Sequence, residues 1–232
     1  MRNKSISFFL AFFFLMNLIS AQESQKTFVL GLSFSPSIDW LSPSTPNYSS
    51  DGVLVGYAYG IDMDFSLAHS PNYFIHTGLQ LKLTGGRLNF TDSSKIQTSN
   101  TTDISRKYKI NYIRIPAAFK LKTNQFGRFT FYGLFGLDFD IRAGATADDE
   151  YRKLNPVSSV NNININDEVS LFRAGLLVGA GAEYTISGNT KAFAGIHYSN
   201  GFTDAFTGTN LSTGLKENAA AKYVELTIGI LF

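Results

Sequence analysis

The residues with the clearest catalytic potential are His197 and Ser199, two positions apart near the C-terminus. A histidine beside a serine can take the hydroxyl proton and activate the oxygen for attack on an ester. Glu217 or Glu225 could orient the imidazole ring. Residues two apart share one face of a β-strand, so a strand over 191–200 would bring the pair together. An esterase is therefore one hypothesis.

Two histidines and an acidic segment are the remaining candidates for metal binding. His69 and His76 lack the spacing of a metal-ligand pair, and we expect solvated or packed side chains. Carboxylates of a long loop could bind Ca²⁺ through oxygen, and the candidates are Asp148, Asp149, Glu150, Asp167 and Glu168. They lack EF-hand spacing, so we expect a solvated acidic loop with no metal or cofactor.

The composition excludes several classes of protein. The chain has no cysteine, which rules out disulfides, cysteine-ligated zinc and thiol nucleophiles. Charged residues make up 16% of the chain, compared with about 25% in ordinary soluble domains. No polycationic segment favours nucleic acid, and we expect no nucleic-acid partner.

The N-terminus has the pattern of a secretory signal peptide. Arg2 and Lys4 precede an apolar run over 8–19, which ends in Ser20 and Ala21. A membrane-anchoring helix needs about 20 apolar residues, and this run is shorter. We therefore predict a signal peptide over 1–21 and a single domain over 22–232. Cleavage would remove two basic residues and leave equal numbers of basic and acidic ones.

Hydrophobic residues then alternate with small or polar ones in a period of two, which indicates β-strands. In the first segment the apolar set is Phe28, Leu30, Leu32, Phe34, Pro36, Ile38 and Trp40. A second segment covers 53–67. Six more follow, at 73–84, 108–121, 128–144, 169–186, 191–200 and 222–232. A tilted transmembrane strand needs about 9–11 residues, which these segments meet or exceed.

The connections separate a membrane barrel from a soluble β-sandwich, which alternation alone does not. Short connections at 68–72, 122–127 and 187–190 alternate with much longer ones. Bacterial outer-membrane barrels have short periplasmic turns and long external loops. The final strand alternates up to the terminal Phe232, and such barrels commonly end in an aromatic residue. The pattern predicts an all-β fold, an eight-stranded antiparallel up-and-down transmembrane β-barrel in the outer membrane.

A barrel of this size has an interior that side chains can fill, so we expect no open pore. Its predicted inward faces carry charges of both signs, which we expect to form ion pairs across the lumen. They are Asp62, Asp64, Lys82, Asp138, Asp140, Arg142, Arg173, Glu183 and Glu225. A narrow channel or proton path is the alternative. Bulges at Gly85–Gly86 or Pro116 could reset the facing of the third and fourth strands.

Four short motifs stand out along the chain: Tyr112–Leu121, Phe131–Gly136, Gly179–Tyr184 and Asn200–Asp204. Together they resemble the Bacteroidota outer-membrane β-barrel family, often called PorT-like or porin-family proteins. The resemblance spans the mature chain and implies an outer-membrane location; a role in type IX secretion belongs to particular members only.

The stretch from His197 to Asn200 is also similar to outer-membrane lipid A deacylases, whose chemistry faces lipid. Here Ala194, Ile196 and Tyr198 form the better lipid-facing set, which turns His197 and Ser199 inward. We therefore predict a non-enzymatic envelope protein with a structural or interaction role. Its partners would be outer-membrane lipid and, through polar loops at 42–51, 91–103 and 157–167, other envelope or secretion proteins.

Overall fold

The computed structural model describes residues 28–92, 102–151, 158–209 and 214–232. The predicted signal peptide lies outside these residues and stays a prediction. Within the described part, no helix is long and apolar enough to cross a membrane.

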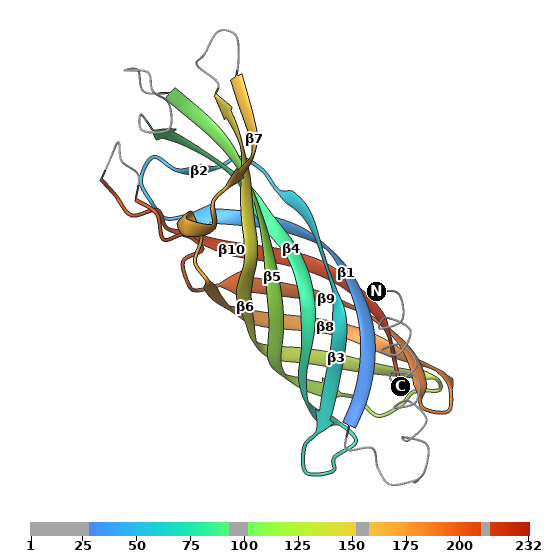
Figure 1. Cartoon of the computed structure of the whole chain (residues 1–232). Coiled ribbons are helices and arrows are strands. Elements are labelled where there is room, and N and C mark those ends of the chain that lie inside the picture. Colours follow the sequence, from blue (N-terminus) through green and yellow to red (C-terminus); the bar gives the residue numbers. More distant parts are fainter. Residues whose placement is uncertain (1–27, 93–101, 152–157, 210–213) are drawn as a thin grey trace, which may run out of the picture.

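Eight antiparallel strands form a closed barrel, as the alternating pattern predicts (Figure 1). Each wall strand pairs with its neighbours along the chain, and the first pairs with the last, from Gly31↔Leu231 to Pro43↔Ala219. The wall strands are β1 (Phe28–Pro43), β3 (Leu54–Ser66), β4 (Tyr73–Asp92), β5 (Thr102–Lys122), β6 (Phe129–Tyr151), β8 (Phe172–Ser187), β9 (Thr190–Gly201) and β10 (Ala219–Leu231). Closure leaves no edge within the wall.

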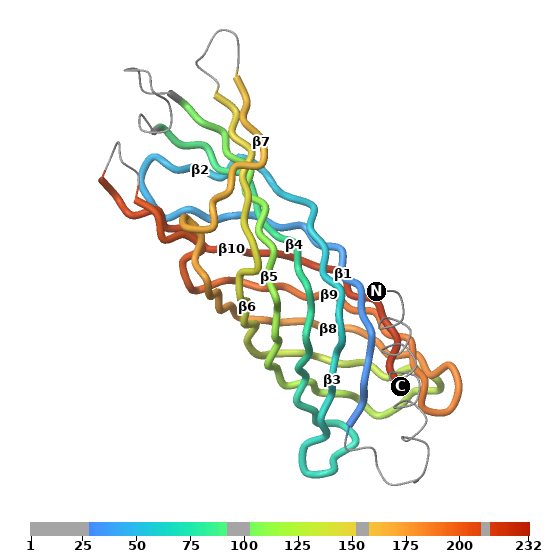
Figure 2. Tube along the Cα trace, in the orientation of Figure 1, coloured from blue at the N-terminus to red at the C-terminus, as the bar shows by residue number. Residues whose placement is uncertain are grey.

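Two short strands and a 3₁₀-helix lie outside the closed wall. β2 (Ser49–Ser50) pairs with β4, and β7 (Ser158–Asn164) pairs with β6. The 3₁₀-helix covers Asn166–Glu168. All three lie at the end of the barrel that carries the long connections, which we call the loop end; the opposite end, with the connections at 67–72, 123–128 and 188–189, is the turn end (Figure 2).

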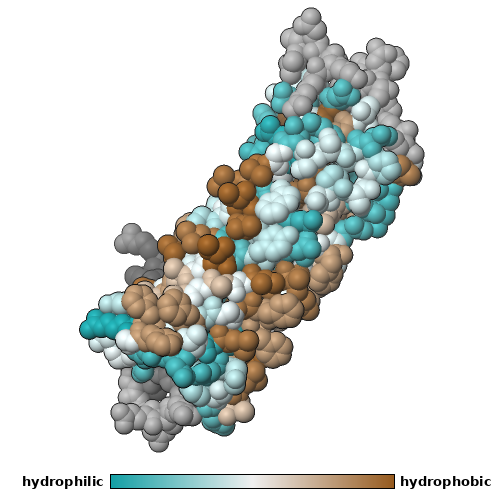
Figure 3. Space-filling model, turned by 180° about the vertical axis from the view of Figure 1, so that it is seen from behind, coloured by the Kyte–Doolittle hydropathy of each residue, from teal (hydrophilic) through white to brown (hydrophobic). Residues whose placement is uncertain are grey.

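The outer wall is apolar where the alternating pattern predicts it. Val224, Leu226, Ile228 and Ile230 of β10 and the terminal Phe232 that follows it are all exposed, and so are Ile196 and Tyr198 of β9. Figure 3 shows the apolar side chains gathered along the middle of the barrel, with hydrophilic ones toward the loop end. Apolar residues exposed on this scale would be unstable in water, but they suit contact with lipid acyl chains.

Three strands extend further than the sequence predicts. β4 continues to Asp92, β5 starts at Thr102 and β6 continues to Tyr151, so these strands project beyond the other wall strands at the loop end (Figure 2). The acidic segment 148–150, predicted as a loop, is therefore part of β6. The bulge also differs from the prediction: no register shift occurs at Gly85–Gly86 or Pro116, whereas one lies between Asn111 and Tyr112 of β5 as they pair with β6.

Candidate functional site

The lumen is the candidate site, because it concentrates nearly all of the buried charge of the wall. Near the turn end, Asp64 contacts His76 Nδ1 at 2.7 Å and Lys120 Nζ at 2.7 Å. Glu183 lies opposite and accepts contacts from Lys120 at 3.0 Å and Lys122 at 2.7 Å. These side chains come from four strands, so the ion pairs cross the lumen and join the wall together.

A second group lies around Glu225 of β10. Its carboxylate contacts Arg114 Nη1 at 3.0 Å and Lys82 Nζ at 3.4 Å. The Lys82 ammonium also contacts Asp39 at 3.3 Å and lies 3.8 Å from the centre of the Tyr223 ring. Ion pairs between side chains of four strands, β1, β4, β5 and β10, therefore occupy the middle of the lumen.

A third group lies around Arg173, closer to the loop end. Its guanidinium contacts Asp138 at 3.0 Å and also contacts Asp140. Asp138 further accepts hydrogen bonds from the hydroxyls of Ser199 at 2.8 Å and Tyr223 at 2.6 Å. Arg173 is 1% exposed and Asp138 is completely buried. Such buried ions are stable only when paired, as they are here.

The prediction of ion pairs within the lumen is confirmed for seven of the nine predicted inward charges. Asp62 instead accepts a hydrogen bond from the Gln80 side chain at 2.6 Å. Arg142 differs: it is only partly buried and donates to the carbonyl of Val169 at 2.6 Å at the loop end. Sequence reasoning missed Arg114, Lys120 and Lys122, although each alternates with lipid-facing residues of β5. The expected bulge at Pro116 had obscured that alternation.

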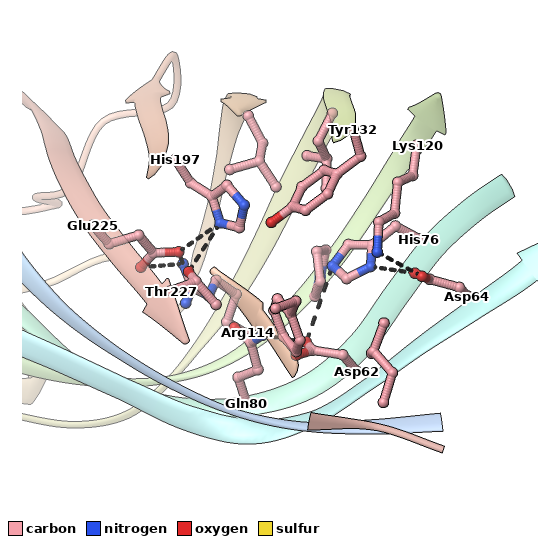
Figure 4. A pocket seen from close by; sticks show the side chains of 15 residues that line it. Asp62, Asp64, His76, Gln80, Arg114, Lys120, Tyr132, His197, Glu225 and Thr227 are labelled. Atoms are coloured by element: carbon pink, nitrogen blue, oxygen red, sulfur yellow. Dashed lines mark hydrogen bonds and ion pairs between the residues drawn. The ribbon is translucent and has the colours of Figure 1, made fainter. Parts of the chain in front are cut away.

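A small cavity remains between the first two groups (Figure 4). Its volume is about 20 Å³, which is enough for about one water molecule. His76 and His197 line it from β4 and β9, with Tyr132 from β6 between them in this view. Nε2 of His197 is buried and has no hydrogen-bond partner among the described residues, so a water in the cavity would satisfy it. The described residues contain no cluster of His, Asp or Glu suited to a metal ion.

The geometry does not assemble the His197–Ser199 pair for catalysis. Both side chains point into the lumen, as the alternation along β9 predicts. His197 is 8% exposed and Ser199 is completely buried. The Ser199 hydroxyl donates to Asp138, whereas His197 Nδ1 contacts Thr227 at 3.1 Å and Glu225 at 3.6 Å. Glu217 lies elsewhere, accepting a hydrogen bond from Tyr48. No lipid ester could reach this serine.

Replacing Ser199 with alanine tests the structural role of its hydroxyl. Loss of the bonds to Asp138 and Arg173 is expected to lower the free energy of unfolding by about 1–3 kcal/mol, because buried charged groups lose partners. The acyl-chain pattern of lipid A in the same cells is expected to be unchanged. Urea unfolding and mass spectrometry of extracted lipid A measure the two effects. Loss of deacylation in the S199A variant would contradict this account.

A close contact between a glycine and an aromatic ring, Gly181 and Tyr132, lies in the turn-end half of the lumen. A Cβ atom on Gly181 would lie 2.5 Å from the Tyr132 hydroxyl and 2.3 Å from the carbonyl oxygen of Ala194. The Tyr132 ring therefore occupies space that a larger residue would take. By contrast, a Cβ on Gly133 of β6 would meet nothing within 4 Å.

Gly181→Ala is expected to lower the free energy of unfolding by about 1–3 kcal/mol, because the backbone or Tyr132 must move. Gly133→Ala is the matched control and is expected to change it by less than about 0.5 kcal/mol. Equal losses of unfolding free energy in the two variants would show that the packing around Tyr132 does not limit the size of the side chain at position 181.

A second, apolar closure lies at the loop end. We call it the loop-end cluster; its buried members include Leu41, Leu88, Phe90, Ile104, Tyr108, Ile110, Tyr112, Ala145, Ala147, Ile165, Val169 and Phe206. The Phe206 ring lies 4.6 Å from the Tyr108 ring. Backbone hydrogen bonds hold the segment around Phe206 to the chain after β7, from Ser170 N to Ala205 O and from Thr207 N to Glu168 O. The cluster covers the lumen.

Three of the five acidic residues considered for Ca²⁺, Asp148, Asp149 and Glu168, have basic partners instead. Arg106 binds Asp149 through two nitrogens and contacts Glu168 at 2.7 Å. Lys109 pairs with Asp148 on the outer surface. Burial alone would raise the pKa of Asp148, but the hydrogen bond from Lys109 and the charges of Lys109 and Lys107 hold it below its ordinary value. These three carboxylates are thus neutralised by the protein itself.

A family model described as an outer membrane protein β-barrel domain matches residues 20–207. No curated protein matches the sequence significantly. Among solved structures, the neisserial surface protein NspA is 13% identical with a TM-score of 0.45, covering 89% of this chain and 96% of its own. The attachment invasion locus protein Ail of Yersinia pestis is 13% identical with a TM-score of 0.36, covering 89% and 100%. OprG of Pseudomonas aeruginosa is 11% identical with a TM-score of 0.39, covering 88% and 93%. At such values no residue role is transferred from them.

Proposed function

This chain belongs to the outer membrane protein β-barrel domain family, and from that premise we propose that it is a non-enzymatic barrel with a structural or interaction role in the cell envelope. The observation that carries the proposal is the filled lumen. Three groups of ion pairs occupy its length and the loop-end cluster covers them. A protein closed in this way offers solutes no path, so its contacts with other molecules are made on the outside.

The loop end supplies the surface for those contacts. In outer-membrane barrels the long connections face outward and the short turns face the periplasm. Here β4, β5, β6 and β7 carry the chain beyond the apolar band, and β7 is exposed along nearly its whole length. Its sequence, with Ser158, Ser159, Val160 and Asn161, offers hydrogen-bonding groups and an exposed apolar side chain. We propose that envelope or external proteins bind there.

The finer family assignment is also a proposal. The short motifs in β5, β6, β8 and β9 support a Bacteroidota, PorT-like member. An accessory role in protein secretion is compatible with a closed barrel, because such a part would act through its surface.

Site-specific photo-crosslinking in cells tests the proposed surface. A photoreactive residue at Val160, which is 45% exposed at the loop end, is expected to give a discrete crosslinked protein. The matched control places it at Phe126, which is 65% exposed at the turn end. Heat-modifiable gel mobility of the membrane fraction confirms that both variants are folded.

Identification of the crosslinked protein separates the roles. A secretion component would support the accessory role, and another envelope or external protein the general interaction role. Crosslinks from Phe126 alone, or from neither site, would contradict a loop-end interaction surface.

A further inference from the structure

The outer surface of β4, β5 and β6 changes from apolar to basic as these strands leave the membrane. Strand pairing places Leu81, Ile113 and Ile141 side by side in one outward row. The next row toward the loop end holds Leu83, Asn111 and Gly144. Above it lie Gly85, Lys109 and Thr146, followed by Arg87, Lys107 and Asp148. Three cations are thus gathered on neighbouring strands just beyond the lipid-facing residues.

The height of these cations suits the headgroup zone. Successive outward rows are about 6.7 Å apart along a strand, or about 5 Å along the membrane normal at the tilt of such barrels. Lys109 therefore lies about 5 Å, and Arg87 and Lys107 about 10 Å, beyond Leu83. The polar zone outside the hydrocarbon core is about 5–7 Å deep on each side. Lys109 lies within this zone, and Arg87 and Lys107 start a few ångströms beyond its outer edge, from where their long side chains can reach back to it, as snorkelling basic side chains do.

Their charges are only partly neutralised within the described residues. Lys109 pairs with Asp148 at 2.5 Å. No ion pair within 4.0 Å is found for Arg87 or Lys107 in the described part of the chain, and both side chains are partly exposed. The other acidic groups on this face, Asp103 and Glu150, lie in rows farther from the membrane. Asp51 beside them accepts a hydrogen bond from Ser105.

We propose that Arg87, Lys107 and Lys109 bind the phosphate of an anionic lipid of the outer leaflet. The acyl chains would lie along Leu81, Leu83 and Ile113 directly below. Arginine suits this ligand because its planar guanidinium can make two parallel hydrogen bonds to a phosphate. Gly144, beside Asn111 and Leu83, leaves room for the headgroup, because a Cβ added there would meet nothing within 4 Å. One lipid thereby spans the boundary that the strand rows define.

Native mass spectrometry of the purified barrel in neutral detergent tests the site, with diphosphorylated lipid A as the probe. We expect it to bind at least about tenfold more tightly than fully dephosphorylated lipid A, since each basic group near an anionic surface contributes to binding. The R87Q/K107Q variant is expected to lose that preference, and R87K/K107R to keep most of it. Heat-modifiable gel mobility shows that each variant is folded.

Lys216→Gln is the matched control, because Lys216 lies in an exposed segment between β9 and β10, with its Nζ 3.9 Å from Asp204. It removes a positive charge and is expected to leave lipid binding unchanged. Equal binding of the two lipids by the wild type would show purely apolar adhesion and overturn the proposal. So would an unchanged preference in R87Q/K107Q, or complete displacement of the lipid by millimolar inorganic phosphate.

Discussion

Arg173→Met is expected to lower the free energy of unfolding by about 3–5 kcal/mol, because it leaves Asp138 and Asp140 buried together without their cation. Removing one partner of a buried ion pair costs far more than removing an exposed pair, since the remaining charge has neither water nor a counterion. Methionine fills most of the arginine volume, so the loss reports charge rather than a cavity. Urea unfolding of barrels refolded into vesicles measures the effect.

Lys191→Met is the matched control for this change. Lys191 also pairs with a lumen carboxylate, Glu183, at 3.2 Å, but its side chain is 29% exposed at the turn end. Glu183 keeps Lys120 and Lys122 as partners. Lys191→Met is therefore expected to lower the free energy of unfolding by less than about 1 kcal/mol. Equal, small losses for both variants would mean that the ion pairs around Arg173 do not hold the lumen together.

Phe206→Ala is expected to lower the free energy of unfolding by about 3–5 kcal/mol, the usual range for truncating a buried phenylalanine. Its ring is 2% exposed and packs against Tyr108, so its removal leaves a cavity within the loop-end cluster. The segments on either side, which Phe206 holds to β5, are expected to become sensitive to added protease. Denaturant unfolding and limited proteolysis of the variant in vesicles measure both effects.

Phe202→Ala provides the comparison, because Phe202 lies in the same connection but is 62% exposed. Its truncation is expected to change stability by less than about 0.5 kcal/mol. If Phe202→Ala and Phe206→Ala were equally stable and equally resistant to protease, the loop-end cluster would not be a structural closure.

The wall of the barrel could be predicted because each lipid-facing row leaves a strict alternation in the sequence. On β9 the alternation alone was sufficient to assign the two faces of the strand: Ile196 and Tyr198 face outward, whereas His197 and Ser199 face inward. That assignment decided between an external catalytic pair and a lumen pair. The signal is strong because lipid excludes polar side chains from one face, so almost every second residue carries information.

The strand extensions could not be predicted, because beyond the lipid the outward residues are polar. On β4 and β5 the outward set becomes Arg87, Lys107 and Lys109, and the contrast with the inward face weakens. On β6 the register shift after Arg142 adds a further difficulty. Even-numbered residues face inward before it, whereas Ala145, Ala147 and Asp149 face inward after it.

The identity of the ion pairs was also beyond sequence reasoning. Alternation assigns Asp138 and Arg173 to the lumen, but which charge meets which depends on the stagger of the strands around the barrel. Arg106 illustrates the same limit at the loop end. Its carboxylate partners, Asp149 and Glu168, come from β6 and the 3₁₀-helix. The sequence predicted a solvated acidic loop, with Ca²⁺ binding as the alternative, whereas in the structure these two carboxylates neutralise an arginine.

Planar-bilayer recording of the purified, refolded protein at neutral pH tests the closed lumen most directly. We expect no steady conductance above the lipid baseline, because ion pairs occupy the lumen and the loop-end cluster covers it. An open porin reconstituted in the same bilayers confirms that channels are detectable. Steady, reproducible conductance steps from the wild-type barrel would contradict the account and make it a channel.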